Sequence, residues 1–364
     1  MTNKIVSSQQ KCVNTIYTFS TEYTADCIEW CPHNPNKHLF VCGNYQYTEP
    51  GTEENTLDKR LGRILLFSIS PHRGLEVLQQ LDTAGVLDIK WCHNQICDVS
   101  LLGIAGSEKT VDIYQLKINK LINLTHYKFR DIVGDTIVLS LDWSTGKYES
   151  SQPNIVCSDS NGKIHLFRLL NSGLNLEKSW NAHDFQAWIS AFYYWDPNII
   201  FSGGDDALFL QFDKRVGDIP VTVNKKHETG VTAVHSNKSN EYVIATGSYD
   251  ESVRLWDIRS LKTPQKTLKM PGPVWKLKWD PFSQELLLSA CMLGGVHVIN
   301  PFKNEMEITH SYYEHANISY GVDWCHLDSK EVEKFDQEGA AIIGTCSFYD
   351  RLLCVSKLSW HFNA

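Results

Sequence analysis

The chain has 364 residues, of which 42% are hydrophobic and 21% charged, with a formal net charge of −8. These values are ordinary for a folded protein, and an acidic chain without a clustered basic stripe argues against direct binding of nucleic acid. The first residues contain no apolar run typical of a signal peptide, and no stretch of about 18 apolar residues could span a membrane. We therefore expect a cytoplasmic protein that does not attach to membranes.

In chain order, short segments of alternating apolar character recur, and most of them end in an aromatic residue. They lie near residues 25–30, 86–91, 138–143, 189–194, 231–235, 274–279 and 319–324. Alternation of this kind is typical of β-strands. The spacing from Trp279 to Trp324 fits the roughly 40 to 45 residues of one propeller blade.

A hairpin pattern follows each of these segments. The clearest is Thr246 to Arg259, TGSYDESVRLWDIR, in which a turn at Tyr249 and Asp250 joins two strands. This is the pattern of a WD repeat, whose four-stranded blade cannot bury both faces of its sheet alone. Seven such units predict an all-β, seven-bladed WD40 β-propeller that forms a single domain over residues 1–364.

The two ends of the chain are expected to close the ring. Residues 16–19 should supply the outer strand of the blade that begins at residues 319–324. A polar segment at residues 47–61 is expected to form a long loop on the face where the innermost strands begin, which usually carries binding sites. Residues 327–339 are charged and are expected to be a solvated loop on the other face.

A buried hydrogen-bonded cluster is expected inside the WD unit. It would join a His ahead of the innermost strand, a Thr on the next strand, the turn Asp and the Trp. Here these residues are His227, Thr246, Asp250 and Trp256. We interpret His227 as structural because buried polar groups need such partners.

The eleven cysteines are odd in number and include no CxxC pair, which is typical of small buried residues in a reducing compartment. The sequence also lacks the HxH and HExxH spacings of metal sites. We expect neither a metal nor a cofactor.

Several segments together resemble the WD-repeat diphthine methylesterase family. They are TEYTADCIEWCP (21–32), SGGDDALFLQFDKR (202–215), TGSYDESVRLWDIR (246–259), PVWKLKWDPF (273–282), SACM (289–292) and TCSFYD (345–350). GSYD and WD occur in many propellers, whereas TCSFYD and EYTADCIEWCP are more discriminating. The match covers most of the chain.

This resemblance implies a carboxylic ester hydrolase. Members of the family hydrolyse the methyl ester of methylated diphthine, a modified histidine of translation elongation factor 2, and release methanol during diphthamide biosynthesis. It therefore implies translation elongation factor 2 as the partner, and we expect the protein to be a monomer.

Diphthine carries a trimethylammonium group, which aromatic ring faces bind well. The candidate binding residues on the loop-bearing face are Tyr45, Trp188, Tyr249, Trp275, Tyr320 and Tyr349, with Asp205 as countercharge. The alternative is that the tryptophans pack between blades and that the aromatic rim binds a partner protein.

Ester hydrolysis also needs a base or a nucleophile, and the sequence has no GxSxG elbow. His183, followed by Asp184, is the candidate base, because Phe212 replaces Trp in its blade and a weakened cluster would free the imidazole. Cys291 is the alternative nucleophile, although it also fits a buried strand thiol without a neighbouring cation.

A second hypothesis is a non-catalytic WD adaptor or scaffold, for example a substrate receptor of a ubiquitin ligase. Residues 255–259, LWDIR, contain the WDxR pattern of such receptors, but Asp and Arg often follow the repeat Trp in any case. Release of methanol by the purified chain would separate the two hypotheses.

Overall fold

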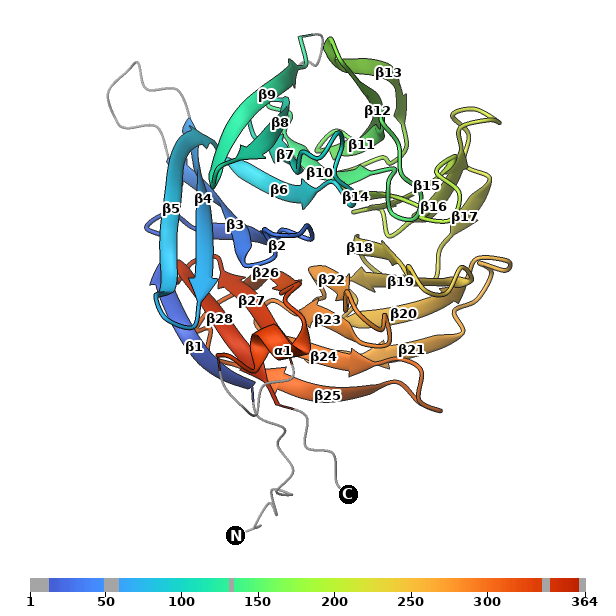
Figure 1. Cartoon of the computed structure of the whole chain (residues 1–364). Helices are drawn as coiled ribbons and strands as arrows, with labels where there is room; N and C mark the ends of the chain where they lie inside the picture. The colour runs from blue at the N-terminus through green and yellow to red at the C-terminus, as the bar shows by residue number, and fades with distance from the viewer. Residues whose placement is uncertain (1–12, 49–58, 131–133, 336–340, 360–364) are drawn as a thin grey trace.

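The computed structural model describes residues 13–48, 59–130, 134–335 and 341–359. Seven four-stranded antiparallel sheets stand around a central channel like the blades of a propeller (Figure 1). The predicted all-β, seven-bladed fold is confirmed.

Six blades follow the chain in order, from the channel outward. Blades 1 and 2 are β2 (Ala25–Trp30), β3 (Leu39–Thr48), β4 (Lys59–Ser70) and β5 (Gly74–Ala84), then β6 (Val86–Trp91), β7 (Leu101–Gly106), β8 (Thr110–Lys117) and β9 (Lys120–Lys128). Blades 3 and 4 are β10 (Val138–Trp143), β11 (Asn154–Asp159), β12 (Lys163–Leu170) and β13 (Gly173–Asn181), then β14 (Ala187–Phe192), β15 (Ile199–Gly204), β16 (Phe209–Asp213) and β17 (Thr222–Asn224). Blades 5 and 6 are β18 (Val231–Ser236), β19 (Val243–Ser248), β20 (Ser252–Asp257) and β21 (Lys266–Lys269), then β22 (Lys276–Trp279), β23 (Leu287–Ala290), β24 (Val296–Asn300) and β25 (Glu307–Tyr312).

Blade 7 combines the two ends of the described chain. It consists of β26 (Ser319–Trp324), β27 (Ala341–Ser347), β28 (Leu352–Leu358) and, outermost, β1 (Val13–Ser20). Val13 lies opposite Leu358 and Ser20 opposite Leu352 in an antiparallel pair. The predicted outer strand at residues 16–19 is therefore confirmed, and this pairing closes the ring.

The aromatic residues that end the innermost strands tie four of the blades to the blade before. The indole N–H groups of four of them donate to main-chain carbonyls of the preceding innermost strand: Trp91 to Glu29 (3.3 Å), Trp143 to Lys90 (2.9 Å), Trp279 to His235 (3.1 Å) and Trp324 to Lys278 (2.9 Å). Each such bond contributes about 0.5–1.5 kcal/mol, in addition to burial of the ring. The recurring aromatic ending thus has a packing cause.

The innermost strand of blade 4 differs from the expectation. It was expected at residues 189–194, but β14 ends at Phe192. The backbone N–H of Phe192 donates to Asp142 (2.8 Å), as that of Trp30 donates to Asp323 (2.6 Å). Phe192, and not Tyr194, therefore takes the position of the final aromatic residue. Because both side chains are aromatic, the sequence alone could not distinguish them.

The core lies between the blades. In one cluster, Trp30, Phe40 and Phe67 of blade 1 pack against Leu353 and Val355 of blade 7. The Phe40 and Phe67 rings stack with their centroids 4.9 Å apart. Because every sheet is buried on both faces by its neighbours, a blade depends on the closed ring for its stability.

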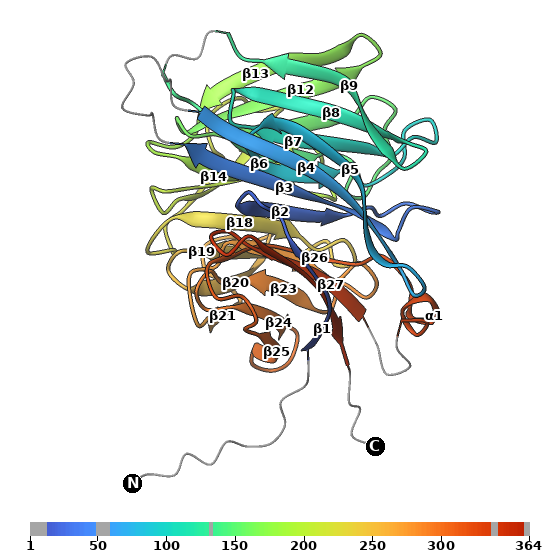
Figure 2. The ribbon, with the colours of Figure 1, turned by 90° about the vertical axis from the view of Figure 1, so that its left-hand side faces the viewer.

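The short helix α1 (Ser329–Val332) marks one face of the ring, seen on the right in Figure 2, where β2 points toward it. We call this the α1 face and the opposite one, where the innermost strands begin, the cavity face. Residues 327–339 were expected to be solvated, which is wrong for Leu327 and Val332: both are buried, 8% and 1% exposed, against blades 7 and 1. Residues 336–340 lie outside the described residues.

The segment expected as a loop at residues 47–61 is partly strand. Thr48 pairs with Lys59, so β3 and β4 extend into it from both sides. Strong pairing of two long neighbouring strands overrides the polar composition. Residues 49–58 lie outside the described residues.

Ten cysteines fall within the described ranges and are free thiols, and all except Cys97 are buried. No helix among the described residues is long and apolar enough to cross a membrane.

Candidate functional site

On the cavity face, the central channel opens into a cavity of about 180 Å³ to which all seven blades contribute. Its lining consists of Asp26, Tyr45, Leu87, Ile137, Leu139, Trp188, Thr232, Trp275, Lys276, Tyr320 and Phe348. Most of these residues are at or just before the start of an innermost strand. Convergence of strand starts on the ring axis therefore brings together side chains that lie far apart in the sequence.

The wall of the cavity is a chain of aromatic rings. Trp188 packs edge-on against Trp275 with ring centroids 5.4 Å apart, and Trp275 stacks on Tyr320 at 4.6 Å. Tyr320 contacts Phe348 at 5.1 Å, and Phe348 lies 6.3 Å from Tyr45. Ring faces of this kind attract cations that carry no hydrogen-bond donor.

Four of the candidate binding residues, Tyr45, Trp188, Trp275 and Tyr320, line this cavity. The other three do not line it, but they touch its wall. Asp205 accepts a hydrogen bond from the indole N–H of Trp188 at 3.0 Å. The Tyr249 ring lies 5.9 Å from Trp275, and burial, followed by the charge of Asp205, raises the pKa of its phenol.

Tyr349 points elsewhere: it is 62% exposed and contacts the outside of Phe348. Phe348, which sequence reasoning missed, takes its place. The backbone N–H of Phe348 donates to Ile318 (3.0 Å), as that of Tyr249 donates to Gly230 (2.9 Å), so these two residues are equivalent. The hairpin TCSFYD has one residue more than TGSYD, and alignment on the serine would have identified Phe348.

The cavity floor carries a carboxyl and an ammonium group. Asp26 is only 4% exposed, and burial raises its pKa well above the ordinary value, against the attraction of Lys276. Lys276 Nζ lies 2.8 Å from Asp88 Oδ1. Burial alone would raise the pKa of Asp88, but Lys276 and Lys90 bring it below its ordinary value.

Asp26 and Asp88 are thus two carboxyls whose surroundings move their pKa values in opposite directions, as in many acid–base sites. Asp88 is the ionised partner of Lys276. Of the two carboxyls, Asp26 is the one that lines the cavity.

The WD unit of blade 5 has the expected hydrogen bonds. His227 Nδ1 lies 2.9 Å from Asp250 and Nε2 lies 2.8 Å from Thr246, whose hydroxyl also accepts from the Trp256 indole at 2.8 Å. Arg254 adds an ion pair to Asp250 at 2.7 Å. These contacts hold the entry to β18 against the hairpin.

His183 has the same surroundings, which corrects the expectation of a free base. Its Nδ1 lies 2.9 Å from Asp206 and its Nε2 lies 2.8 Å from Ser202, and the side chain has no exposed surface. Asp206 serves as the turn Asp of blade 4, so the cluster persists even though Phe212 stands where blade 5 has Trp. With both nitrogens engaged, the imidazole does not reach the cavity.

The remaining catalytic candidates also lie away from the cavity. Asp184 is exposed, and its backbone N–H donates to Asp206 at 3.3 Å. Cys291 is completely buried beside Ser289, and burial raises the pKa of its thiol to about 12. Because the thiolate is the reactive form, Cys291 is not suited to act as a nucleophile.

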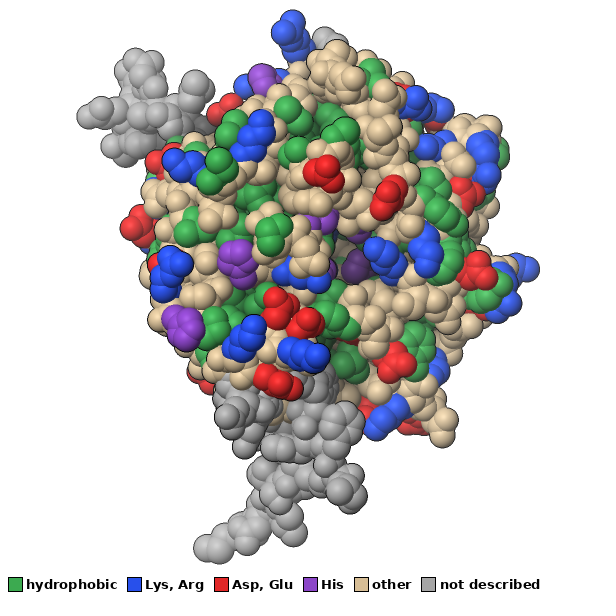
Figure 3. Space-filling model, in the orientation of Figure 1, with side chains coloured by type: hydrophobic (Ala, Val, Ile, Leu, Met, Phe, Trp, Pro, Cys, Tyr) green, Lys and Arg blue, Asp and Glu red, His purple; other side chains and the backbone are tan. Residues whose placement is uncertain are grey.

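The other end of the channel differs in charge. On the α1 face, lysine and histidine side chains gather around the central hollow (Figure 3), a cavity of about 320 Å³ lined in part by Lys90, Lys238, Lys278 and His235. Glu29 pairs with Lys278 and lies 3.9 Å from Lys90. Both mouths have aromatic side chains in their lining, but this one carries four lysines against two carboxylates, whereas the mouth on the cavity face carries one of each, Lys276 and Asp26.

Comparison with known proteins gives related sequences and folds. The family described as WD domain, G-beta repeat, matches residues 219–257. A chain of the crystal structure of the mitotic checkpoint complex shares the fold, with a TM-score of 0.70 and 16% identity over 99% of this chain and 96% of that chain.

The human protein named diphthine methyltransferase is 37% identical over 88% of this chain and 76% of its own length. The diphthine methyltransferase homolog of Dictyostelium discoideum is 36% identical over 92% of this chain and 96% of its own. The DDB1- and CUL4-associated factor 11 homolog of Caenorhabditis elegans is 31% identical over 37% of this chain and 25% of its own. Because the first two alignments span most of both chains, this chain belongs to the diphthine methyltransferase family of WD-repeat proteins.

Proposed function

We propose that this protein acts in diphthamide biosynthesis and hydrolyses the methyl ester of methylated diphthine on translation elongation factor 2, giving diphthine and methanol. The names of its relatives support the pathway, although they denote methyl transfer and our proposal is methyl removal. The observation that carries the proposal is the aromatic cavity with Asp26 and Lys276 at its floor.

The chemistry of the substrate favours this mouth of the channel. A trimethylammonium group has a permanent charge and no N–H, so ring faces such as those of Trp188, Trp275 and Tyr320 bind it with about 0.5–2 kcal/mol each. At the mouth on the α1 face, four lysines against the two carboxylates of Glu29 and Asp323 leave an excess of positive charge that would repel the same group, whereas Lys276 in the cavity is paired with Asp88. We therefore assign substrate binding to the cavity face.

In the proposed reaction, the Asp26 carboxylate removes a proton from water as the water oxygen attacks the ester carbonyl carbon. The ammonium of Lys276 stabilises the negative charge that develops on the carbonyl oxygen. The bond from carbon to the methoxy oxygen then breaks, and the proton passes from Asp26 to the departing methoxide. Because burial raises the pKa of Asp26, its carboxylate is a stronger base than that of an exposed aspartate.

The test is methanol release from methylated elongation factor 2 by the purified chain, with Asp26→Asn as the variant and Asp184→Asn as its matched control. Loss of the base should lower turnover by about 100-fold or more. Asp184→Asn should retain turnover, since Asp184 is exposed and does not line the cavity. A folded Asp26→Asn protein with full turnover would remove Asp26 from the mechanism.

A non-catalytic adaptor is the second candidate function, favoured by the similarity to the DDB1- and CUL4-associated factor 11 homolog. Arg259 of the WDxR pattern is exposed, but it forms an ion pair with Asp257 at 2.6 Å, which gives it a local role in the fold. An adaptor would bind its partner and release no methanol, so the same assay separates the two functions.

A further inference from the structure

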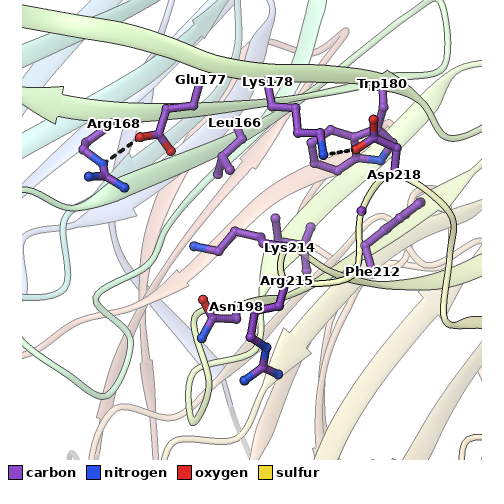
Figure 4. A pocket seen from close by; sticks show the side chains of 12 residues that line it. Leu166, Arg168, Glu177, Lys178, Trp180, Asn198, Phe212, Lys214, Arg215 and Asp218 are labelled. Atoms are coloured by element: carbon purple, nitrogen blue, oxygen red, sulfur yellow. Dashed lines mark ion pairs between the residues drawn. The ribbon is translucent and has the colours of Figure 1, made fainter.

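A second site lies far from the channel, in a groove of about 350 Å³ between the outer parts of blades 3 and 4. Figure 4 shows its lining, which comprises Leu166, Arg168, Glu177, Lys178, Trp180, Asn198, Ile200, Phe212, Lys214, Arg215, Gly217 and Asp218. Strands β12 and β13 form one wall, and β15, β16 and the segment leading to β17 form the other. The apolar base of the groove is surrounded by charged side chains.

Two hydrogen-bond donors in this groove have no acceptor among the described residues. Trp180 is 8% exposed, and its buried indole nitrogen has no hydrogen-bond partner in the part of the chain that the structure describes. Buried N–H groups are nearly always paired, so an unpaired one in a cavity wall indicates a missing acceptor. The ring itself is held by an edge-on contact with Phe212 at 5.5 Å.

The second donor is Lys214, whose side chain reaches into the groove in Figure 4. Among the described residues, no carboxylate lies within ion-pair distance of its ammonium. Burial is the main cause that lowers the pKa of Lys214; the charges of Arg168 and Arg215 add to it, and those of Glu177 and Asp196 oppose it. An anion bound in the groove would relieve this repulsion.

The carboxylates of the groove are already engaged. Glu177 pairs with Arg168 at 2.8 Å on the wall opposite Lys214, and Asp218 pairs with Lys178 across the groove, as Figure 4 shows. Arg215 is held by Asp213 at 2.7 Å. Lys214 is thus the cation of the groove that forms no ion pair among the described residues, and a carboxylate is the group that would complement it together with the Trp180 N–H.

An apolar margin continues from the groove along the outer edge of blade 4. Its members are Val216 (70% exposed), Ile219 (79%), Val221 (46%) and Val223 (49%). Val223 belongs to β17, the outermost strand of this blade. Edge strands offer unpaired main-chain groups, and exposed apolar rows with a polar rim are typical of protein-binding surfaces.

We propose that this groove and its apolar margin bind an extended segment of a partner protein in which acidic residues stand next to apolar ones. A carboxylate of the segment is accepted by Lys214 and the Trp180 indole, and its apolar side chains cover Val221 and Val223. Charge complementarity favours this occupant, because the groove is cationic although the whole chain has a net charge of −8. The inference rests on the groove alone and does not depend on ester hydrolysis.

The experiment measures binding of a synthetic peptide in which glutamates alternate with valines, with a second peptide that carries glutamine at each glutamate position. Calorimetry gives the affinity, and the indole N–H resonance of Trp180, assigned by its loss in Trp180→Phe, reports the site. The variants are Lys214→Gln and Trp180→Phe. Lys262→Gln, an exposed lysine outside the groove, is the matched control.

The glutamate peptide should shift the Trp180 resonance and bind about tenfold more weakly to Lys214→Gln, as expected for a lost charged hydrogen bond. Trp180→Phe should weaken binding while keeping the ring packing, and Lys262→Gln should bind like the wild type. Three results would overturn the proposal: equal binding of the glutamine peptide, equally tight binding of inorganic phosphate, or self-association of the chain that Lys214→Gln abolishes.

Discussion

Lys276 on β22 of blade 6 reaches across the central channel to Asp88 on β6 of blade 2, with 2.8 Å between Nζ and Oδ1. The two blades are not neighbours in the ring, so the pair exists only once the propeller has closed. Lys276 thereby places a positive charge beside the buried carboxyl of Asp26, and Asp88 is the ion-pair partner of that charge. The cavity floor is therefore a product of ring closure and not of any single repeat.

Replacing Lys276 tests the electrostatics of this floor. Lys276 lowers the pKa of Asp26 against the larger effect of burial, so Lys276→Met should raise that pKa further. If Asp26 acts as an unprotonated base, the acidic limb of kcat/KM against pH should move to higher pH. Turnover should fall by about 100-fold, because the developing oxyanion loses its counterion. Lys276→Arg, which keeps the charge, should leave the limb in place; an unmoved limb in Lys276→Met would contradict the assignment.

The aromatic wall predicts a preference for a cation. Trp275→Leu keeps an apolar side chain but loses the ring face, so it should weaken binding of the trimethylammonium ester by about twofold to thirtyfold. Binding of a neutral ester with a tert-butyl group in place of the trimethylammonium should change much less. Measured KM values for both esters check this prediction, and equal losses would indicate simple apolar contact.

Tyr249 and Tyr349 should behave differently from each other. The Tyr249 ring packs edge-on against Trp275, so Tyr249→Ala should weaken ester binding. Tyr249→Phe keeps the ring and should have little effect. Tyr349→Ala should have little effect at all, because its side chain is 62% exposed and outside the cavity. A strong loss of turnover in Tyr249→Phe would show that the hydroxyl takes part in the chemistry.

His183 and Asp250 should prove structural. His183→Ala leaves Asp206 and Ser202 without their partner, and Asp250→Ala does the same to His227 and Arg254. Each change should lower the free energy of unfolding by about 1–3 kcal/mol. Urea denaturation measures this loss, and turnover per folded molecule should be retained at low temperature. Unchanged stability together with lost turnover would return His183 to the list of candidate bases.

Buried and half-buried histidines predict a loss of stability in mild acid. Burial lowers the pKa of His33 and His315 from 6.5 to about 4, and that of His326 to about 3. Below pH 6.5 the unfolded chain binds protons that the folded protein excludes, so the free energy of unfolding must fall as the pH drops toward these values.

The expected slope is up to about 1.4 kcal/mol per pH unit for each such histidine. Denaturation curves between about pH 7 and pH 4 measure this slope. His33→Gln should lower it by the contribution of one histidine, up to about 1.4 kcal/mol per pH unit. A stability that stays constant over this range would show that these imidazoles become protonated in the folded protein.

The repeat architecture could be predicted from the sequence because one physical contact recurs. A final aromatic residue such as Trp143 or Trp324 packs between blades and hydrogen-bonds the preceding innermost strand, so its position is visible in every repeat that retains it. The prediction failed where this signal was ambiguous. In blade 4, four aromatic residues follow one another, Phe192 to Trp195, and Phe192 is the one that ends the strand and donates its backbone N–H to Asp142.

The candidate site could be predicted only in part. The aromatic residues could be found because they stand at fixed positions of the repeat. In the last hairpin, one extra residue places Phe348, and not the predicted Tyr349, at that position. Asp26, Lys276 and Asp88 form a unit only through the closed ring, and no local pattern relates three blades to one another. His183 was misjudged because its partner Asp206 does not depend on the missing Trp.

The most direct measurement follows the methyl group and the oxygen atoms together. Purified protein is incubated with methylated elongation factor 2 in water labelled with the heavy oxygen isotope, without any added methyl donor or acceptor, and the methanol and the modified peptide are analysed by mass spectrometry. The proposed hydrolysis predicts unlabelled methanol and one labelled oxygen in the diphthine carboxylate, with both products lost in Asp26→Asn. Absence of methanol, or a methyl group gained by diphthine when a methyl donor is supplied, would contradict the proposed function.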